Sequence, residues 1–353
     1  MAATTNPLHG THSPSSPAVS SQTHTIAGIL VTVHGLSEVP SSASQIACLW
    51  LLHPRLQTRE TMAPIASQII STWNTSNKPT STHKGLIAIA FDQRNHGSRQ
   101  VDALHNQAWR EGNPRHAQDM FSCYHGTATD TSHLLDYIES YILTTPTSPR
   151  ITQHLALGIS LGGHAVWHCL LADPRITAGV VGIGCPDYTR LMTHRARLSK
   201  RESHAATSPP GAAFLGSADF PPALQSAVAQ FDPAGLLLPN YFSPTTPDPP
   251  LEKAARDRFS ILVRERLAGK QILNLSGKVD KLVPYSAGEP FLNVLKGVLR
   301  DDPGLDVKLE DVLFEGVGHA FPKQMADKAA EWICGVLAKD GGNEKERGVV
   351  SKI

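Results

Sequence analysis

The sequence predicts an α/β domain with a mostly parallel, doubly wound sheet of about eight strands. Short apolar runs of strand length alternate with longer runs of helical period, which is typical of repeated βαβ units. Several of the short runs are almost wholly apolar, as strands covered on both faces must be. The expected strands span residues 26–34, 46–52, 86–91, 154–158, 178–184, 271–275 and 307–314.

Helices are expected between these strands, because apolar residues recur there with a period near 3.6. The first such stripe, after the second run, contains Met62, Ala66, Ile69, Ile70 and Trp73. Two more stripes have the same spacing: Leu134, Leu135, Ile138, Tyr141 and Ile142, then Met325, Ala329, Trp332, Ile333 and Val336.

The chain of 353 residues is long enough for one large domain with a deep core. We expect this domain at residues 25–338, a disordered N-terminal arm at 1–24 and a flexible tail at 339–353. A proline-rich stretch at about 190–269 interrupts the alternation, because proline fixes φ and ends helices. It predicts a cap of short helices over the carboxyl edge of the sheet, between the sixth and seventh of the eight strands, which are the runs at 178–184 and 271–275.

Composition excludes several classes of function. The 32 Lys and Arg against 31 Asp and Glu give a net charge of +1, which argues against a nucleic-acid or anionic-membrane partner. No apolar run approaches the roughly 18 residues of a membrane-spanning helix. The five cysteines are scattered, without C-x-x-C, which favours a reducing compartment and a cytoplasmic location. The ending Ser351-Lys352-Ile353 is one conservative change from Ser-Lys-Leu, so peroxisomal import is the alternative.

The candidate nucleophile is Ser160, in the sequence Gly158-Ile159-Ser160-Leu161-Gly162. An apolar strand precedes this segment and a helical run follows it, the context in which a sharp turn lifts a serine hydroxyl above a sheet. The first backbone N–H of that helix, from Leu161, would then point at a forming oxyanion.

A serine nucleophile requires a histidine base and a carboxylate to orient it. His319 follows the last predicted strand and Asp280 follows the one before it, so both lie at the sheet edge that carries Ser160. Asp187 follows the strand at 178–184 and is the competing carboxylate. The sequence alone leaves that choice open.

At this point the chain resembles the α/β-hydrolase superfamily over roughly residues 25–338. Residues 91–99 look like the family's D-x-R-G-H-G-x-S turn, 277–284 like its G-x-x-D-x-x-V-P acid loop, and 318–321 fit its histidine loop. The chain is most similar to fungal members, with likeness to the dienelactone-hydrolase and prolyl-oligopeptidase catalytic domains.

The chain departs from the family pattern after the family's third strand, here the run at 46–52, where His53-Pro54 replaces the usual His-Gly. Proline has no N–H to donate. The motif therefore puts the second oxyanion donor at the backbone of Arg55, with Leu56 as the alternative. The Arg55 side chain would be solvated or structural, pair with Asp92, or bind a substrate carboxylate.

The resemblance implies a carboxylic-ester hydrolase that acts on a small or medium-sized substrate through an acyl-enzyme and needs no cofactor. Thioester or peptide cleavage on the same triad is the alternative, and a non-catalytic ligand-binding or sensor protein is a hypothesis of another class. No metal site is predicted: His164 and His168 are four residues apart, but no H-E-x-x-H motif accompanies them.

Overall fold

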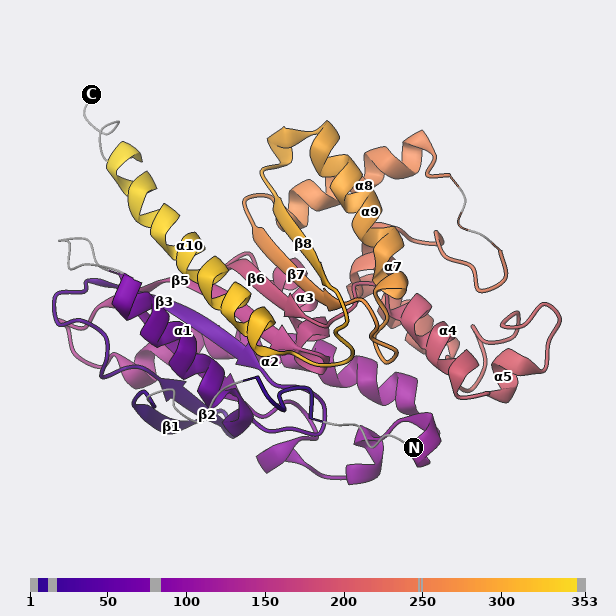
Figure 1. Cartoon of the computed structure of the whole chain (residues 1–353), viewed down its shortest axis with the longest axis horizontal. Coiled ribbons are helices and arrows are strands. Elements are labelled where there is room, and N and C mark those ends of the chain that lie inside the picture. Colours follow the sequence, from indigo (N-terminus) through magenta and orange to yellow (C-terminus); the bar gives the residue numbers. More distant parts are fainter. Residues whose placement is uncertain (1–5, 12–17, 77–83, 247, 249, 348–353) are drawn as a thin grey trace.

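The structure, a computed structural model, describes residues 6–11, 18–76, 84–246, 248 and 250–347 (Figure 1). Its centre is an eight-stranded sheet in the order β1-β2-β4-β3-β5-β6-β7-β8. β1 and β2 are antiparallel to their neighbours, and the pairs from β4–β3 to β7–β8 are parallel. The predicted sheet is confirmed. The strands are β1 (Ser21–Ile26), β2 (Ile29–His34), β3 (Gln45–Leu52), β4 (Gly85–Phe91), β5 (Arg150–Ile159), β6 (Ile176–Gly182), β7 (Gln271–Gly277) and β8 (Lys308–Phe314).

The single strand predicted at 26–34 is two strands, and this expectation was wrong. Ile26 pairs with Ile29, so Ala27 and Gly28 form a two-residue hairpin loop in which φ is +48° and +80°. Two positive φ values in succession give the turn whose twist matches an antiparallel pair. β1 therefore begins at Ser21, within the predicted arm at 1–24.

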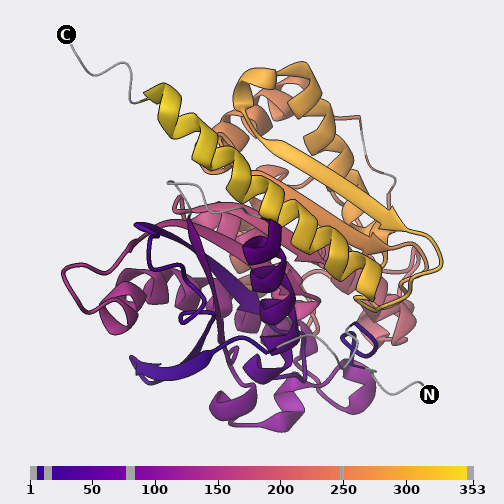
Figure 2. The same cartoon turned by 60° about the vertical axis from the view of Figure 1, so that its left-hand side comes forward.

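Helices cover both faces of the sheet. α1 (Ala63–Ser76) and α10 (Lys323–Arg347) lie side by side on one face (Figure 2), where Gln68 Nε2 donates to Asp327 Oδ1 over 2.8 Å. The opposite face packs against α2 (His116–Ile142), α3 (Leu161–Ala172) and α9 (Tyr285–Asp301). The sheet is thus buried on both sides, which explains its almost wholly apolar central strands.

The cap lies between β6 and β7, as predicted. It contains α4 (Tyr188–Leu198), α5 (Glu202–Ala205), α6 (Pro222–Phe231), α7 (Pro233–Leu237) and α8 (Lys253–Leu267). Pro222 and Pro233 begin their helices, where the missing N–H costs no hydrogen bond. Outside the cap, short 3-10 helices lie at Arg59–Met62, Gly97–Arg99, Ala103–Asn106, Trp109–Glu111 and Pro303–Leu305.

The last helix, α10, continues through residue 347, within the segment that was expected to be a flexible tail. The tripeptide Ser351-Lys352-Ile353 lies outside the described residues, so the cytoplasmic or peroxisomal location stays a prediction. None of the helices in the described ranges combines the length and apolarity that crossing a membrane would require.

Buried neutral histidines predict that the fold loses stability in mild acid. Burial lowers the pKa of His53 and His154 to about 4 and that of His164 to about 3, with His116 and His168 also well below the usual value. The unfolded chain binds these protons near pH 6.5, so the stabilisation is complete above that pH and is lost as the pH falls from about 6.5 towards 4. Each fully buried ring contributes at most about 1.4 kcal/mol per pH unit.

The measurement is urea unfolding at pH 7.5, 6.5 and 5.5. We expect the free energy of unfolding to fall by several kcal/mol in total, mostly below pH 6.5. A free energy that is constant from pH 7.5 to 5.5 would contradict the neutral, buried state of these rings.

Candidate active site

Ser160 occupies a strained turn between β5 and α3. Its φ is +55°, a conformation that residues with a side chain rarely adopt. Two backbone hydrogen bonds hold the turn: Ser160 N–H donates to Gly182 O over 2.8 Å, and His164 N–H donates to Ser160 O over 3.0 Å. The turn thus directs the hydroxyl away from the strand and the helix that flank it.

The glycines around Ser160 are required by close backbone contacts. A Cβ at Gly158 would lie 2.1 Å from Gly162 O, and one at Gly162 would lie 2.0 Å from Leu52 O. These distances are too short for any side chain. The G-x-S-x-G pattern therefore reflects the packing of β5 and α3 against β3, as well as the turn itself.

Gly162→Ala should destabilise the fold by several kcal/mol or displace the Ser160 turn, because backbone carbonyls cannot yield as a flexible side chain can. The matched control is Gly335→Ala in α10, where nothing lies within 4 Å of the added Cβ. There we expect a neutral effect or a gain of up to about 1 kcal/mol from helix propensity. Urea unfolding of both variants measures the difference, and equal stability would contradict the close packing at Gly162.

Ser160, His319 and Asp280 form one chain of hydrogen-bonding side chains. Ser160 Oγ lies 2.9 Å from His319 Nε2, and His319 Nδ1 lies 2.7 Å from Asp280 Oδ2. The other carboxylate oxygen of Asp280 accepts from Leu282 N–H at 2.8 Å and from Val283 N–H at 2.9 Å. Asp280 is buried, while the His319 side chain remains 15% exposed. The structure therefore brings together the three residues that the sequence singled out.

The competing carboxylate, Asp187, has other partners. Its Oδ1 caps α4 by accepting from Arg190 N–H at 2.9 Å, and its Oδ2 pairs with Arg190 Nε at 3.2 Å. Burial raises the pKa of Asp187, while the hydrogen bonds from Arg190 and its charge lower it. Among the described contacts, the carboxylate that faces His319 is that of Asp280.

The two predicted oxyanion donors lie in defined local structures. Leu161 is the first residue of α3, whose first N–H groups have no partner within the helix. Arg55 and Leu56 follow β3 in a turn closed by Gln57 N–H donating to Pro54 O over 3.2 Å. Leu56 has a φ of +63°.

His53 anchors that turn, a role that sequence analysis missed. Its Nδ1–H donates to Pro54 O at 2.8 Å and its Nε2 accepts from Gln93 N–H at 2.9 Å. Thr127 Oγ1 donates to Gln93 Oε1 over 3.1 Å. The ring is buried, which lowers its pKa to about 4 and keeps it neutral. The feature of the sequence that could have indicated this role is the position of His53 immediately after β3.

Asp92 organises the turn after β4. It accepts from Ser98 N–H at 2.9 Å and pairs with the Arg59 guanidinium. A Cβ at Gly97 would lie 2.3 Å from Asp92 Oδ1, so only glycine fits beside the carboxylate. Asp92 is therefore not a partner of the Arg55 side chain, whose Nη1 donates instead to Asn106 O at 2.7 Å.

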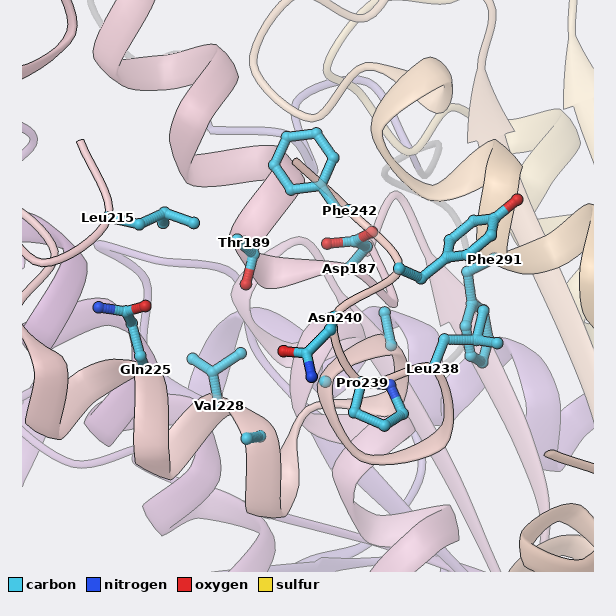
Figure 3. Close-up of a pocket in the computed structure, with 14 residues that line it drawn as sticks. Asp187, Thr189, Leu215, Gln225, Val228, Leu238, Pro239, Asn240, Phe242 and Phe291 are labelled. Carbon is cyan, nitrogen blue, oxygen red and sulfur yellow. The ribbon is translucent and has the colours of Figure 1, made fainter. Parts of the chain in front are cut away.

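The cap contains a cavity of about 150 Å³ that does not include the triad residues (Figure 3). Asp187 and Thr189 from the start of α4, Asn240 and Phe242 from the loop after α7, and Phe291 from α9 are among its lining residues. The cap was expected to shape a substrate pocket over the sheet edge. Residues of the cap and of α9 line this cavity, and Ser160 is not among them. The cavity is therefore not the substrate pocket that was expected over Ser160.

The two histidines of α3, His164 and His168, lie close to different partners. His164 Nδ1 lies 3.0 Å from both the N and the O of Cys185, and His168 Nδ1 lies 3.4 Å from His125 Nδ1. No group of metal-ligating side chains is found within the described ranges.

The fold resembles that of solved structures, although no family model and no curated protein matches the sequence. TT1662 from Thermus thermophilus matches over 89% of this chain and 96% of its own, with 16% identity and a TM-score of 0.54. The Pyrococcus furiosus esterase Pf2001 matches over 91% of each chain, with 12% identity and a TM-score of 0.46. The Pyrococcus horikoshii acylaminoacyl peptidase matches over 90% of this chain and 41% of its own, with 12% identity and a TM-score of 0.45.

At these identities the likeness concerns the fold. The strand order, the helices on both faces and the similarity to TT1662 show an α/β-hydrolase fold, as expected. The closer likeness to fungal members stays a prediction.

Proposed function

We propose that this chain, which has the α/β-hydrolase fold, is a serine hydrolase that cleaves a carboxylic ester of a small or medium-sized substrate. The observation that supports this is the contact chain from Ser160 Oγ through His319 to Asp280, with distances of 2.9 and 2.7 Å. Both distances suit proton transfer from the hydroxyl to a base that a carboxylate orients.

In the acylation step, His319 Nε2 takes the proton of the Ser160 hydroxyl while Oγ attacks the ester carbonyl carbon. Asp280 accepts the hydrogen bond from Nδ1–H and stabilises the imidazolium that forms. Leu282 and Val283 N–H hold the other Asp280 oxygen, so the carboxylate keeps the orientation that this hydrogen bond needs.

The tetrahedral intermediate requires donors for its oxyanion. We assign them to the backbone N–H groups of Leu161 and Arg55, with Leu56 N–H as the alternative second donor. The imidazolium then protonates the leaving alcohol. In the second half, His319 removes a proton from water, the hydroxide attacks the acyl-enzyme, and Ser160 regains its proton as the acid leaves. His319 takes part in every one of these proton transfers.

Thioester and peptide substrates remain the runner-up, because the acyl chemistry is the same and only the leaving group differs. A non-catalytic ligand-binding or sensor protein is the hypothesis of another class. It does not explain why the Ser160 hydroxyl lies within hydrogen-bond distance of the oriented His319 ring. A ligand-binding role alone does not need that geometry.

The experiment is a panel of p-nitrophenyl esters of increasing acyl length, run beside acyl-CoA thioesters and aminoacyl substrates. We expect the highest kcat/KM on esters of short or medium chain length. Higher kcat/KM on the thioesters or aminoacyl compounds would change the substrate class. Turnover of none of them, together with no labelling by a fluorophosphonate, would overturn the hydrolase proposal.

A further inference from the structure

Residues 6–11, the N-terminal segment, are folded against the domain and lie within the arm that was expected to be disordered at 1–24. Pro7 and Thr11 are buried, and Leu8 packs against the core that α1 and α10 share with the sheet. In Figure 2 the segment is the short indigo loop between two grey stretches, near the start of α10. This part of the expected arm therefore has a fixed place in the structure.

The N-terminal segment binds one residue of the histidine loop, which connects β8 to α10. Phe321 N–H donates to Pro7 O over 2.8 Å, and the Thr11 hydroxyl donates to Phe321 O over 2.6 Å. Phe321 is fully buried, and buried backbone groups need such partners. Thr11 precedes Phe321 by 310 positions, so the two ends of the domain meet at this residue.

The hydrogen bonds to Phe321 lie two residues after His319, and another hydrogen bond holds the loop two residues before it. On that side, Val279 N–H of the acid loop donates to Val317 O over 3.0 Å. The acid loop therefore anchors the histidine loop before His319, and the N-terminal segment anchors it after His319.

The Phe321 side chain connects the same residue to the turn that carries Ser160. A Cβ at Gly182 would lie 2.7 Å from Phe321 Cε2, so the ring packs directly on that glycine. Gly182 O accepts from Ser160 N–H at 2.8 Å. A shift of Phe321 would therefore change the position of His319 relative to Ser160.

The proposed reaction tolerates little change in these positions. Ser160 Oγ lies 2.9 Å from His319 Nε2, and His319 Nδ1 lies 2.7 Å from Asp280 Oδ2, and proton transfer needs both contacts. A misplacement of about 1 Å in such an arrangement costs about 10²-fold in rate. Loops move more readily than strands and helices, so a loop that carries the base needs anchors on both sides of it.

From the two hydrogen bonds that Pro7 and Thr11 make with Phe321, we infer that the N-terminal segment positions the histidine loop for the proposed reaction. Its residues act through Phe321, so they are positioning residues. Their loss should lower kcat and kcat/KM equally, because it weakens an arrangement that is needed in the transition state. This inference rests on the proposed function and adds to it the element that positions the base.

The first test measures the histidine loop directly and needs no substrate. Hydrogen exchange, followed by mass spectrometry of a peptide that contains Phe321, reports the opening of the loop. Leu8→Asp places a carboxylate where Leu8 now packs against the core, and it should raise the exchange rate by about tenfold or more. Thr11→Val removes the hydroxyl and should raise the rate by about fivefold, the scale of one hydrogen bond. Thr11→Ser retains the donor and should stay closer to the wild type.

The second test measures kcat and KM of the same variants on the best p-nitrophenyl ester. Leu8→Asp should lower kcat by about 10- to 100-fold, Thr11→Val should lower it less, and Thr11→Ser should restore most of the loss. The matched control is Thr131→Val, on α2, because Thr131 is also fully buried and its hydroxyl donates to a carbonyl, Thr127 O, over 2.8 Å. This control should lose stability in urea unfolding but keep the kcat of the wild type.

Each outcome decides the inference. It is overturned if neither Leu8→Asp nor Thr11→Val raises the exchange rate at Phe321, or if kcat is unchanged in a variant whose exchange rate has risen. An equal fall of kcat in Thr131→Val would also overturn it, because kcat would then follow stability alone. The Thr11 variants keep the test intact if Leu8→Asp fails to fold. A wild type that neither turns over an ester nor reacts with a fluorophosphonate would instead refute the proposed function, and hydrogen exchange would still show whether the segment holds the loop.

Discussion

Replacing Ser160 by alanine is expected to lower kcat for ester hydrolysis by roughly a million-fold, the scale for loss of the nucleophile from a serine triad. The physical reason is that Ser160 Oγ forms the covalent bond to the acyl group, and alanine has no atom in its place. Measurements of kcat on the best p-nitrophenyl ester, and of the mass added by a fluorophosphonate, check it. The wild type should gain one phosphonyl adduct and the variant none.

Ser140→Ala is the matched control, since Ser140 is exposed on α2 and its hydroxyl donates only to a local carbonyl, Tyr137 O. It should label and turn over as the wild type does. Urea unfolding of Ser160→Ala establishes that the variant is folded. A folded variant that still labels or hydrolyses esters at an appreciable rate would remove Ser160 from the mechanism.

Replacing Asp280 by asparagine is expected to lower kcat by about 10⁴-fold, as the same change does to the orienting acid of other serine triads. The amide would offer an N–H where Nδ1–H of His319 now donates, so the ring would be held in the wrong tautomer. Leu282 and Val283 N–H favour an oxygen at the other position, which leaves the amide nitrogen facing the ring. The measurement is kcat across pH 6 to 9.

Asp187→Asn is the comparison for this prediction. That carboxylate caps α4 and pairs with Arg190, so its loss should lower the stability of the cap far more than it lowers kcat. If Asp187→Asn instead caused the large fall in kcat and Asp280→Asn stayed near the wild type, the role of orienting acid would pass to Asp187.

The central part of the fold could be predicted from the sequence because buried parallel strands need continuous apolar runs. The runs that became β3, β4 and β5 are of this kind. The hairpin between β1 and β2 was missed because Ala27-Gly28 lies inside one apolar run, and only the backbone conformation divides it.

The candidate site was partly predictable for a similar reason. Ser160, Asp280 and His319 each follow a strand directly, so chain order and topology place them at one edge. The sequence could not choose between Asp280 and Asp187, because both follow strands, and the choice depends on which carboxylate is within 2.7 Å of a ring 39 positions away from Asp280. The contact of the N-terminal segment with Phe321 has no local motif. It joins residues 310 positions apart, and no pattern in the sequence describes such a contact.

The position of His319, after the last strand of the sheet, has a consequence for synthesis of the chain. Ser160 and its turn leave the ribosome long before His319, the proposed base, which arrives only after the end of β8. A nascent or C-terminally truncated chain would therefore carry an inert serine. A fluorophosphonate would therefore label only those molecules that have been translated past β8 and whose sheet has assembled.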